Sequence, residues 1–530
     1  MAKMPVWFDA NGSFGKQSTG QADFPTIQDR LDYMNRFGIS RSLVWNQEIS
    51  QDYARSCNQR LIDEIEKTPG ASGRIIPALA ISGMMLYERN GIDYLYEQMK
   101  STGSRALRFS SGYGRLTLCQ LEPVVRKIRK LKPFIALKHD QASIQDILDF
   151  TEMFPDIPLV ITDVIWVPCI TVFDLMRRRK NIMIENSWLH TQRIVEIVVE
   201  HFGAERLLFG TGYKSHAGAA MGALARARIT DAERRLIASG NLDRLTGLKT
   251  TSAKLPAPSA SNQLWPRFME GKPLDVDIVD AHAHLGPSGG FVLEFQEEKQ
   301  QLALAMEIMQ RTGMKTMLIA GTTAILGAPV EGNDLAESVL RPHAGQFHAY
   351  LGFNPFYANE LLPRLDSYFS GPVFVGFKTL CDYWHIPITD KRYEPMWDYA
   401  NRHCLPVLNH TWDGQWDSPA MFKDIVRRYP NVQFLLGHSG GGDGGRREAE
   451  ELTRENRNVY MEFCGSFCST ILWEDTLRTV DHRQVLFGTD AMSHDINWEL
   501  ARMLSLDVPD ETLVPILGAN MRRILAMRRR

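Results

Sequence analysis

A chain of 530 residues is too long for one ordinary domain, because domains usually have roughly 100 to 200 residues and α/β barrels about 250. Hydrophobic residues make up 44% of the chain and charged residues 23%, which predicts a soluble globular protein with a large core. No apolar run approaches the roughly 18 residues of a membrane span. The formal net charge of −2, with acids and bases interspersed, excludes a surface that gathers nucleic acid or anionic lipid.

The first ten residues, MAKMPVWFDA, pass almost directly into a strand pattern and lack the apolar region and cleavage site of a signal peptide. Seven scattered cysteines, an odd number, favour reduced thiols over a disulfide framework. We therefore expect a cytoplasmic protein.

A shift in composition divides the chain. The segment KTTSAKLPAPSASNQLWPRFMEGKP is rich in Ser, Ala and Pro and has no apolar periodicity, which is typical of a linker. We predict a first domain at residues 1–248, a linker at 249–274 and a second domain at 275–530.

The second domain contains eight short apolar, β-branched runs, with helix-length amphipathic segments between them. The runs are VDIVDAHAH, MKTMLIAGT, HAYLGFN, FVGFK, LPVLNH, VQFLLGH, VYMEF and QVLFGTD. Strands that alternate with helices at about 30-residue spacing form parallel βα units, and eight such units close a barrel. We therefore predict an α/β fold, a (β/α)8 barrel of the TIM type, at residues 275–530.

The first domain repeats this series in the same order. The clearest matches are NIMIENSW with NVYMEFCG, RLLFGTGYKS with QVLFGTDAMS, and SGNLDRLTGL with GANMRRILAM, each pair about 275 residues apart. Similar segments in one order indicate duplication of a whole domain. The prediction for the full chain is two tandem (β/α)8 barrels.

Four histidines and one aspartate stand at predicted strand ends of the second domain: His282 and His284 on the first strand, His410 on the fifth, His438 on the sixth and Asp490 on the eighth. Residues two apart on a strand point to one face, so the first two imidazoles can converge on one ion. Active sites in barrels lie at the C-terminal ends of the strands, so all five should face one pocket. The other histidines, such as His385 and His494, are interpreted as hydrogen-bonded core residues.

Histidine nitrogens with a carboxylate oxygen are the ligands of a catalytic Zn²⁺, or of Mn²⁺ or Fe²⁺. We favour a zinc ion held by His282, His284, His410 and Asp490. His438 would then stand beside the metal's water as an acid, a base or a donor to the substrate carbonyl. Asp490 can also take a proton from that water.

Lys378 ends the fourth predicted strand in the sequence GFK. A carboxylated lysine there could bridge a second metal, which would give two ions per chain instead of one. The alternative, which we favour, is a free ammonium that pairs with a pocket carboxylate or a substrate anion, although a buried lysine shifts its pKa readily and the sequence cannot choose.

The second domain resembles the amidohydrolase superfamily, in particular the amidohydrolase-2 branch that includes decarboxylases of the aminocarboxymuconate-semialdehyde type. The segments that carry the resemblance are DAHAH, GFNPF, VGFK, LPVLNHT, FLLGHSGGG, LFGTDA and GANMRRIL. The resemblance implies metal ligands at His282, His284, His410 and Asp490 and a catalytic histidine at His438. Lys378 departs from the decarboxylase-type members, which do not need a bridging lysine.

The first domain resembles the same family without its chemistry. DAHAH is replaced by DANGS, so Asn11 and Ser13 stand at the two histidine positions, and Gly212 stands at the aspartate position. Arg108 lies near the lysine position, His139 survives at the fifth strand and Asp163 takes the sixth-strand position. One remaining imidazole cannot hold a catalytic ion tightly. We interpret this domain as a pseudoenzyme, and we expect it to pair with the second barrel as a covalent pseudo-dimer, with further homo-oligomers left open.

Three functions are compatible with these residues. We favour metal-dependent hydrolysis of an amide, lactam, lactone or ester in a small organic substrate. The alternative is nonoxidative decarboxylation of an aromatic or unsaturated acid, for which Lys378 could orient the carboxylate. A metal-binding scaffold without turnover is the third. Trp384, Trp412 and Trp416 follow the fourth and fifth strands, where they either face an aromatic substrate or only pack the loops.

Overall fold

The computed structural model describes residues 5–17, 21–50, 53–111, 116–212, 214–251, 260–465 and 468–529. The chain divides into two compact units. Unit 1 comprises residues 1–260 and 290–292, and unit 2 comprises residues 261–289 and 293–530. All seven cysteines are free thiols. Among the described helices, none has the length and apolar character needed to cross a membrane.

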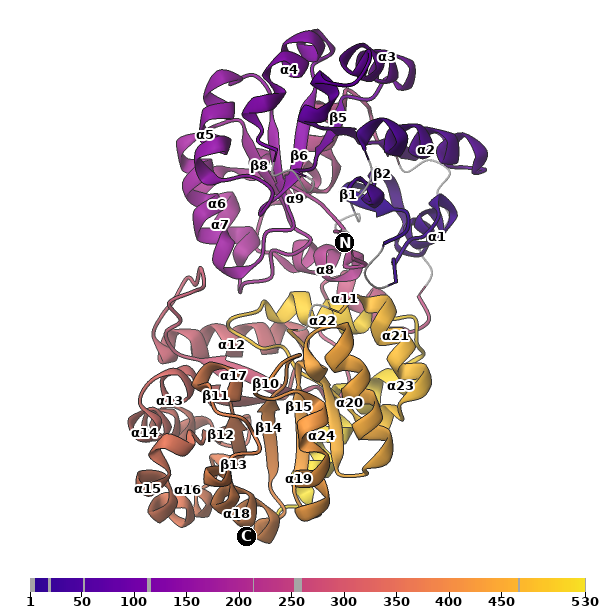
Figure 1. Cartoon of the computed structure of the whole chain (residues 1–530). Coiled ribbons are helices and arrows are strands. Elements are labelled where there is room, and N and C mark those ends of the chain that lie inside the picture. The colour runs from indigo at the N-terminus through magenta and orange to yellow at the C-terminus, as the bar shows by residue number, and fades with distance from the viewer. Residues whose placement is uncertain are drawn as a thin grey trace. The chain divides into compact units, whose positions relative to one another are not determined.

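Unit 2 is built on eight parallel strands that pair in chain order, from the first to the last (Figure 1). They are β10 Val279–Leu285, β11 Thr316–Gly321, β12 Phe347–Gly352, β13 Phe374–Thr379, β14 Pro406–His410, β15 Gln433–Gly437, β16 Val459–Phe463 and β17 Val485–Phe487. A parallel sheet of eight strands in sequence order is the inner layer of a TIM-type barrel. The barrel predicted for the second half of the chain is therefore confirmed.

The first and last strands meet and bring the sheet close to a closed ring. The backbone N–H of Asp490 donates to the carbonyl of His282 over 2.7 Å, and that of Met492 donates to the carbonyl of His284 over 3.0 Å. Asp280 reinforces the junction, because its Oδ1 accepts from the backbone N–H of both His282 and Thr489, each at 3.0 Å. Its Oδ2 accepts from the Thr489 hydroxyl over 2.5 Å. One buried carboxylate thus joins residues that lie 209 positions apart in the chain.

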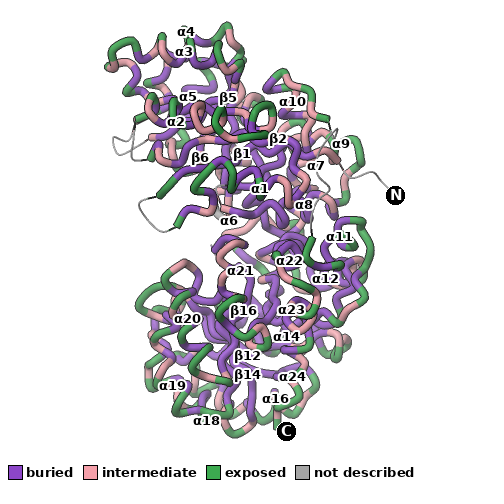
Figure 2. The backbone as a smooth tube through the Cα atoms, turned by 90° about the vertical axis from the view of Figure 1, so that its right-hand side faces the viewer, coloured by how far each residue is buried: buried purple, intermediate pink, exposed green. Residues whose placement is uncertain are grey.

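Helices surround this sheet. They are α11 Leu264–Met269, α12 Glu298–Thr312, α13 Thr322–Leu326, α14 Pro329–Leu340, α15 Ala358–Leu361, α16 Leu365–Ser370, α17 Cys381–Trp384, α18 Glu394–His403, α19 Lys423–Arg428, α20 Asp443–Glu455, α21 Thr470–Thr479, α22 Ile496–Leu504, α23 Asp510–Val514 and α24 Asn520–Ala526. Figure 2 shows that the strands are buried and that exposed residues gather on the outer helices, such as α18 and α19. Apolar side chains from all eight strands, among them Leu318, Leu408 and Leu486, form the core.

Unit 1 carries a similar succession of parallel strands, divided between two sheets. The first sheet contains β1 Trp7–Phe14, β2 Ile39–Asn46 and β3 Ile75–Pro77, and the second contains β4 Leu79–Ile81, β5 Ala106–Phe109, β6 Phe134–Lys138, β7 Leu159–Thr162, β8 Ile182–Glu185 and β9 Leu207–Leu208. Only Ala78 separates β3 from β4. The helices are α1 Ile27–Phe37, α2 Ala54–Lys67, α3 Gly91–Thr102, α4 Glu122–Ile128, α5 Ile144–Met153, α6 Trp166–Arg178, α7 Ile194–Phe202, α8 Ala217–Arg226, α9 Asp231–Arg235 and α10 Asn241–Thr246.

The strand junction of unit 1 repeats the hydrogen bonds that the buried aspartate makes in unit 2. Asp9 Oδ1 accepts from the backbone N–H of Asn11 over 3.0 Å and of Thr211 over 2.8 Å. These are the contacts that Asp280 makes with His282 and Thr489, at the positions that the sequence repeat pairs.

The last helix of each unit also begins in the same way. A π-helical turn precedes it in both, at Leu236–Gly240 and at Pro515–Ala519. The Asn that follows then donates to two backbone carbonyls, Ala204 and Leu207 for Asn241, and His482 and Val485 for Asn520. The repeat in the sequence is thus accompanied by a repeat of specific polar contacts.

The segment between the units differs in one respect from the predicted linker at residues 249–274. Residues 252–259 lie outside the described part of the chain. Helix α11 occupies the later part of the segment, with Leu264 and Phe268 buried, and the Asn262 side chain donates to the carbonyl of Leu504 over 3.0 Å. This part belongs to unit 2. Its few apolar residues lack periodicity along the sequence, but they pack against the surface of that unit.

We predict that Asp280→Ala lowers the free energy of unfolding by about 3 kcal/mol, because it leaves buried N–H and hydroxyl groups without their acceptor. The measurement is the urea unfolding transition of the full chain, followed by tryptophan fluorescence. Asp424→Ala is the control, because the Asp424 side chain is 99% exposed and its loss should change the value by less than about 0.5 kcal/mol. Equal transitions for the two variants would contradict the role given to Asp280.

Candidate metal centre

Three of the predicted ligands converge at the C-terminal end of the barrel. His284 Nε2 lies 3.2 Å from His282 Nε2 and 3.1 Å from Asp490 Oδ1, and His282 Nε2 lies 3.8 Å from the same oxygen. The three atoms form a compact group that could hold a metal ion. Ligands of a tetrahedral Zn²⁺ at about 2.0 to 2.1 Å lie roughly 3.3 Å from one another. The spacing therefore suits a divalent ion.

The rings of the two β10 histidines are held by their other nitrogens. His282 Nδ1 lies 2.9 Å from Glu462 Oε2, and His284 Nδ1 lies 3.0 Å from the carbonyl oxygen of Ala320. Both acceptors favour the tautomer with the proton on Nδ1, which leaves the Nε2 lone pairs facing the same point. Two such lone pairs beside a carboxylate attract a cation, so the donor set itself fits a metal.

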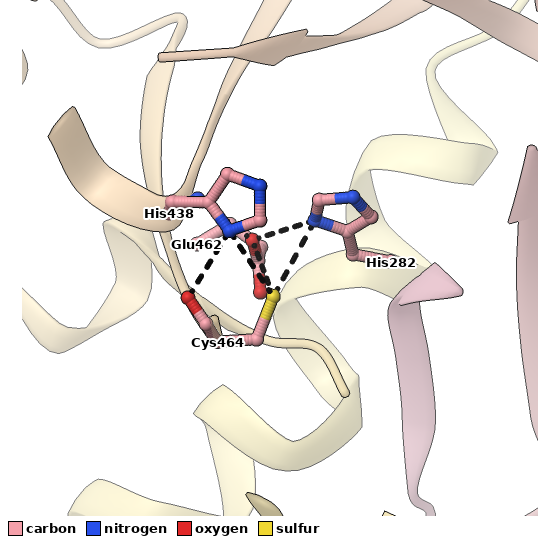
Figure 3. A group of neighbouring side chains, drawn as sticks. All are labelled: His282, His438, Glu462 and Cys464. Atoms are coloured by element: carbon pink, nitrogen blue, oxygen red, sulfur yellow. Dashed lines mark hydrogen bonds and ion pairs between the residues drawn. The ribbon is translucent and has the colours of Figure 1, made fainter. Parts of the chain in front are cut away.

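His282 also belongs to a second cluster of polar side chains, with His438, Glu462 and Cys464, which Figure 3 shows. Glu462 Oε2 also accepts from the backbone N–H of His438 over 3.1 Å, and the Cys464 thiol lies 3.2 Å from the same oxygen. His438 Nδ1 lies 3.3 Å from the carbonyl oxygen of Cys464. Glu462 closely approaches Gly488, where a Cβ atom would lie 2.2 Å from Oε1. A single carboxyl group thus supports both His282 and His438.

His410 lies beside this group rather than within it. Its Nδ1 is 2.9 Å from Asp417 Oδ2, which directs Nε2 the other way, and its ring centroid is 5.0 Å from that of His438. The ring of His438 is in turn 4.9 Å from that of His282. The imidazoles therefore form a continuous row, and His410 stands at its far end from His284.

Lys378 reaches the centre of the site. Its side chain is fully buried, and Nζ lies 2.9 Å from His282 Nε2. Burial lowers the pKa of this amine to about 8, against the opposing charge of Asp490. At neutral pH the amine is therefore mostly an ammonium, and no other described side-chain cation bonds to His282.

Burial and neighbouring groups also shift the pKa values of His282, His438 and Asp490. Burial lowers the pKa of His282 and of His438 well below the usual range, so both imidazoles are neutral at pH 7. Burial raises the pKa of Asp490, but the neighbouring imidazoles of His284 and His494 outweigh this effect and leave the pKa of the carboxyl group well below its ordinary value. Neutral imidazoles and an ionised carboxylate bind divalent cations without first losing protons.

The three tryptophans that the sequence singled out have different surroundings. Trp412 lies parallel to His410 at a ring distance of 5.9 Å and edge-on to His438. Trp384 instead donates through Nε1 to the carbonyl of Ile325, and Trp416 contacts the ring of His385. Tyr383, which is 59% exposed, lies edge-on to His410. Trp412 and Tyr383 are thus the aromatic groups beside the imidazole row.

Sequence reasoning missed the groups that support these residues. Glu462 and Asp417 escaped notice, although a glutamate inside the apolar run VYMEF was a usable signal. His494 is a buried, hydrogen-bonded residue as expected, but its Nε2 also lies 3.5 Å from Asp490 Oδ2. Its role could not be read from the sequence, because it depends on which neighbour the ring faces.

The corresponding region of unit 1 retains the framework but has different groups at its centre. Glu185 Oε1 accepts from the Asn11 side chain over 3.1 Å and from the backbone N–H of Asp163 over 2.7 Å, as Glu462 does from His282 and His438. Arg108 is buried, donates to Thr162 Oγ1 over 3.0 Å and lies 3.8 Å from Asp163 Oδ2. A guanidinium thus provides the positive charge among these acids.

Of the remaining positions in unit 1, two lack an imidazole or carboxylate and one keeps its imidazole. Ser13 is buried in β1, and Gly212 has a positive φ of 75°. His139 lies beside apolar residues of a separate hollow, with Ile144, Ile161 and Pro168 around it.

A family model described as amidohydrolase matches residues 279–526. That stretch contains all of the strands and the described site of unit 2. Residues 279–526, just under half of the chain, are therefore similar in sequence to the enzymes of the amidohydrolase family. By sequence, no curated protein matches the chain.

Solved structures with a similar fold each match just under half of the chain. They include a dihydroxybenzoic acid decarboxylase from Polaromonas sp. JS666 with bound manganese and 2-nitroresorcinol (15% identity, TM-score 0.38, 48% of this chain and 97% of that one). A 2,6-dihydroxybenzoate decarboxylase from Rhizobium matches with 14% identity and TM-score 0.37, over 48% and 99%. A 5-carboxyvanillate decarboxylase from Sphingomonas paucimobilis matches with 12% identity and TM-score 0.38, over 48% and 99%.

We predict that Glu462→Leu weakens metal binding by unit 2 roughly 10- to 100-fold, because the acceptor that orients His282 is lost. The measurement is competition with a chelator of known affinity. Glu185→Leu is a matched control, because it removes the equivalent carboxyl group in unit 1, where the ligand positions are Asn11 and Ser13. Equal metal affinity in the two variants would show that Glu462 has no such role.

Proposed function

We propose that unit 2 is a metal-dependent decarboxylase that removes the carboxyl group of a small aromatic or unsaturated acid without an oxidant. The observation that carries this proposal is the buried amine of Lys378, whose Nζ lies 2.9 Å from His282 Nε2. A decarboxylase must hold the carboxylate of its substrate, and a desolvated cation does this strongly. Hydrolysis of a neutral amide or ester needs no such cation.

We propose that His282, His284 and Asp490 hold the ion, with His410 as the fourth ligand. The pairwise distances of 3.1, 3.2 and 3.8 Å support the first three, and the free direction of His410 Nε2 supports the fourth. A divalent ion bound there polarises a substrate oxygen and stabilises the charge that develops on it. We propose Zn²⁺ as the bound ion; Mn²⁺ and Fe²⁺ bind the same types of donor atom.

The chain's own residues would act as follows. Lys378 pairs with the substrate carboxylate, and Trp412 lies against its planar part. The bond between the carboxyl carbon and the ring carbon breaks, its electron pair stays on the ring carbon, and CO2 leaves. That carbon then takes a proton from His438, or alternatively from Asp490, after that group has first taken one from water, because the imidazole is neutral and the carboxyl group is ionised before the reaction. No oxidant or reductant is needed.

Hydrolysis of an amide, lactam, lactone or ester is the second candidate. It is favoured if Lys378 carries a carboxyl group, because its Nζ is close enough to His282 Nε2 for such a group to join the ligand set and hold a second ion. Asp490 would then accept a proton from the attacking water and return it to the leaving group. The ordinary pKa of lysine is about 10.4, and a value near 8 eases carboxylation without making it necessary.

We infer that unit 1 is a degenerate copy of unit 2 that arose by tandem duplication. The matching contacts of Asp9 with Asp280, Glu185 with Glu462 and Asn241 with Asn520 support this origin. Its ligand positions carry Asn11, Ser13 and Gly212, so we propose no metal chemistry for it. A covalent pseudo-dimer of the two units stays a prediction.

The purified full chain should contain about one equivalent of divalent metal, and His282→Ala with His284→Ala should remove it. Elemental analysis after dialysis measures both. The control is Asn11→Ala with Ser13→Ala, which alters the same two strand positions in unit 1 and should leave the metal content unchanged. Metal-free wild-type protein under metal-replete conditions would overturn the proposed function.

Two substitutions at Lys378 distinguish the candidate reactions. For a decarboxylase, Lys378→Met should lower kcat/KM roughly 100- to 1000-fold, and Lys378→Arg should recover part of the loss because it restores a cation. The measurement is CO2 release from a panel of hydroxybenzoic acids, with lactones and amides assayed in parallel. Equal inactivity of both variants, with a fall from two metal equivalents to one, would instead indicate a carboxylated lysine and a hydrolase.

A further inference from the structure

The two oxygens of Asp490 have different partners. Oδ1 faces the imidazoles of His284 and His282, whereas Oδ2 faces His494, whose Nε2 lies 3.5 Å away. A carboxylate that holds a metal with one oxygen is free to rotate unless the other oxygen is fixed. His494 is buried and stands at the position to fix it.

His494 is itself held by Glu499. Its Nδ1 lies 2.8 Å from Glu499 Oε1, and the glutamate belongs to α22. The same Oε1 accepts from the backbone N–H of Gly465 over 3.0 Å. Gly465 lies between His438 and Asp490, because a Cβ atom there would be 2.6 Å from Nδ1 of the histidine and 2.9 Å from Oδ2 of the aspartate. Glu499 therefore supports the site through a side chain and through the backbone.

Arg502, one turn further along α22, pairs with Glu499. Its Nη1 lies 3.6 Å from Glu499 Oε2, both side chains are almost wholly buried, and its guanidinium stacks 3.8 Å above the ring of Trp473. Burying an ion pair removes two charges from water, and the attraction between them often fails to compensate. Apolar residues of similar size often give the fold an equal or greater free energy of unfolding than such a pair. The presence of the pair therefore calls for a reason other than stability.

Unit 1 provides the comparison. Aligning LFGTGYKSH with LFGTDAMSH pairs Gly212 with Asp490 and His216 with His494, and it continues to Met221 opposite Glu499 and Leu224 opposite Arg502. Met221 and Leu224 are as deeply buried in α8 as the ion pair is in α22. The same helix therefore packs with apolar residues in the unit that has no aspartate at the metal position. The charges accompany Asp490 and are not needed by the fold.

We propose that Glu499 is a positioning residue for the metal ligand Asp490, acting through His494, and that Arg502 fixes Glu499. This inference rests on the proposed function, in which Asp490 holds the ion. It explains why a buried acid and base occupy α22, whereas α8 has Met and Leu.

The test uses the full chain and Mn²⁺ as the probe, with affinity measured by competition against a chelator and the ligand field followed by electron paramagnetic resonance. The central variant is Glu499→Met with Arg502→Leu, which installs the residues of unit 1. Its control is Glu450→Met with Arg446→Leu, which removes another buried ion pair of unit 2, on α20. Glu499→Gln keeps an oxygen for His494 and serves as the conservative variant.

We expect the central variant to unfold cooperatively but to bind Mn²⁺ roughly 10- to 100-fold more weakly and with an altered spectrum. The control should bind like wild type, and Glu499→Gln should lose less than the central variant. Wild-type affinity in the central variant, or an equal loss in the control, would overturn the inference and leave the metal site intact. Failure of the wild-type chain to bind Mn²⁺ or any other divalent ion would overturn the proposed function together with it.

Discussion

The site depends on the junction between the first and last strands of unit 2. Asp280 accepts hydrogen bonds from the backbone of β10 and from the segment after β17, and these bonds bring His282 and His284 next to Asp490. Without that junction the two histidines of β10 and Asp490 would lie at opposite edges of an open sheet. Because Asp280 is buried, its hydrogen bonds compete with no water, and a loss of any one leaves a polar group unsatisfied.

A set of polar groups then fixes the direction of each donor. Glu462 orients His282, the carbonyl of Ala320 orients His284, Asp417 orients His410, and His494 faces the second oxygen of Asp490. Each of these contacts determines which atom of the donor remains for an ion. Such supporting groups set ligand geometry and basicity as much as the ligands do.

The two units separate the contacts that maintain the fold from those that serve chemistry. Asp9, Glu185 and Asn241 in unit 1 make the bonds of Asp280, Glu462 and Asn520, so these belong to the shared framework. The positions that differ lie around the proposed ion site: Asn11 and Gly212 stand where unit 2 has His282 and Asp490, and Arg108 provides a cation among the acids. The Arg108 guanidinium compensates the buried acids around it, as a bound cation would in unit 2.

The sequence by itself determined the barrel of the second half, since strand and helix periodicity recur eight times, and it predicted that His282, His284 and Asp490 converge, since polar residues at the ends of apolar strands are rare. It also pointed to Lys378 but did not decide whether the amine of that lysine is free or carboxylated. Only the tertiary structure decided that Lys378 reaches His282, that His410 stands beside the cluster, that Trp412 rather than Trp384 faces the imidazoles, and that Glu462 and Glu499 support them. Side-chain direction depends on neighbours far away in the chain, and one sequence carries no record of which distant residues meet.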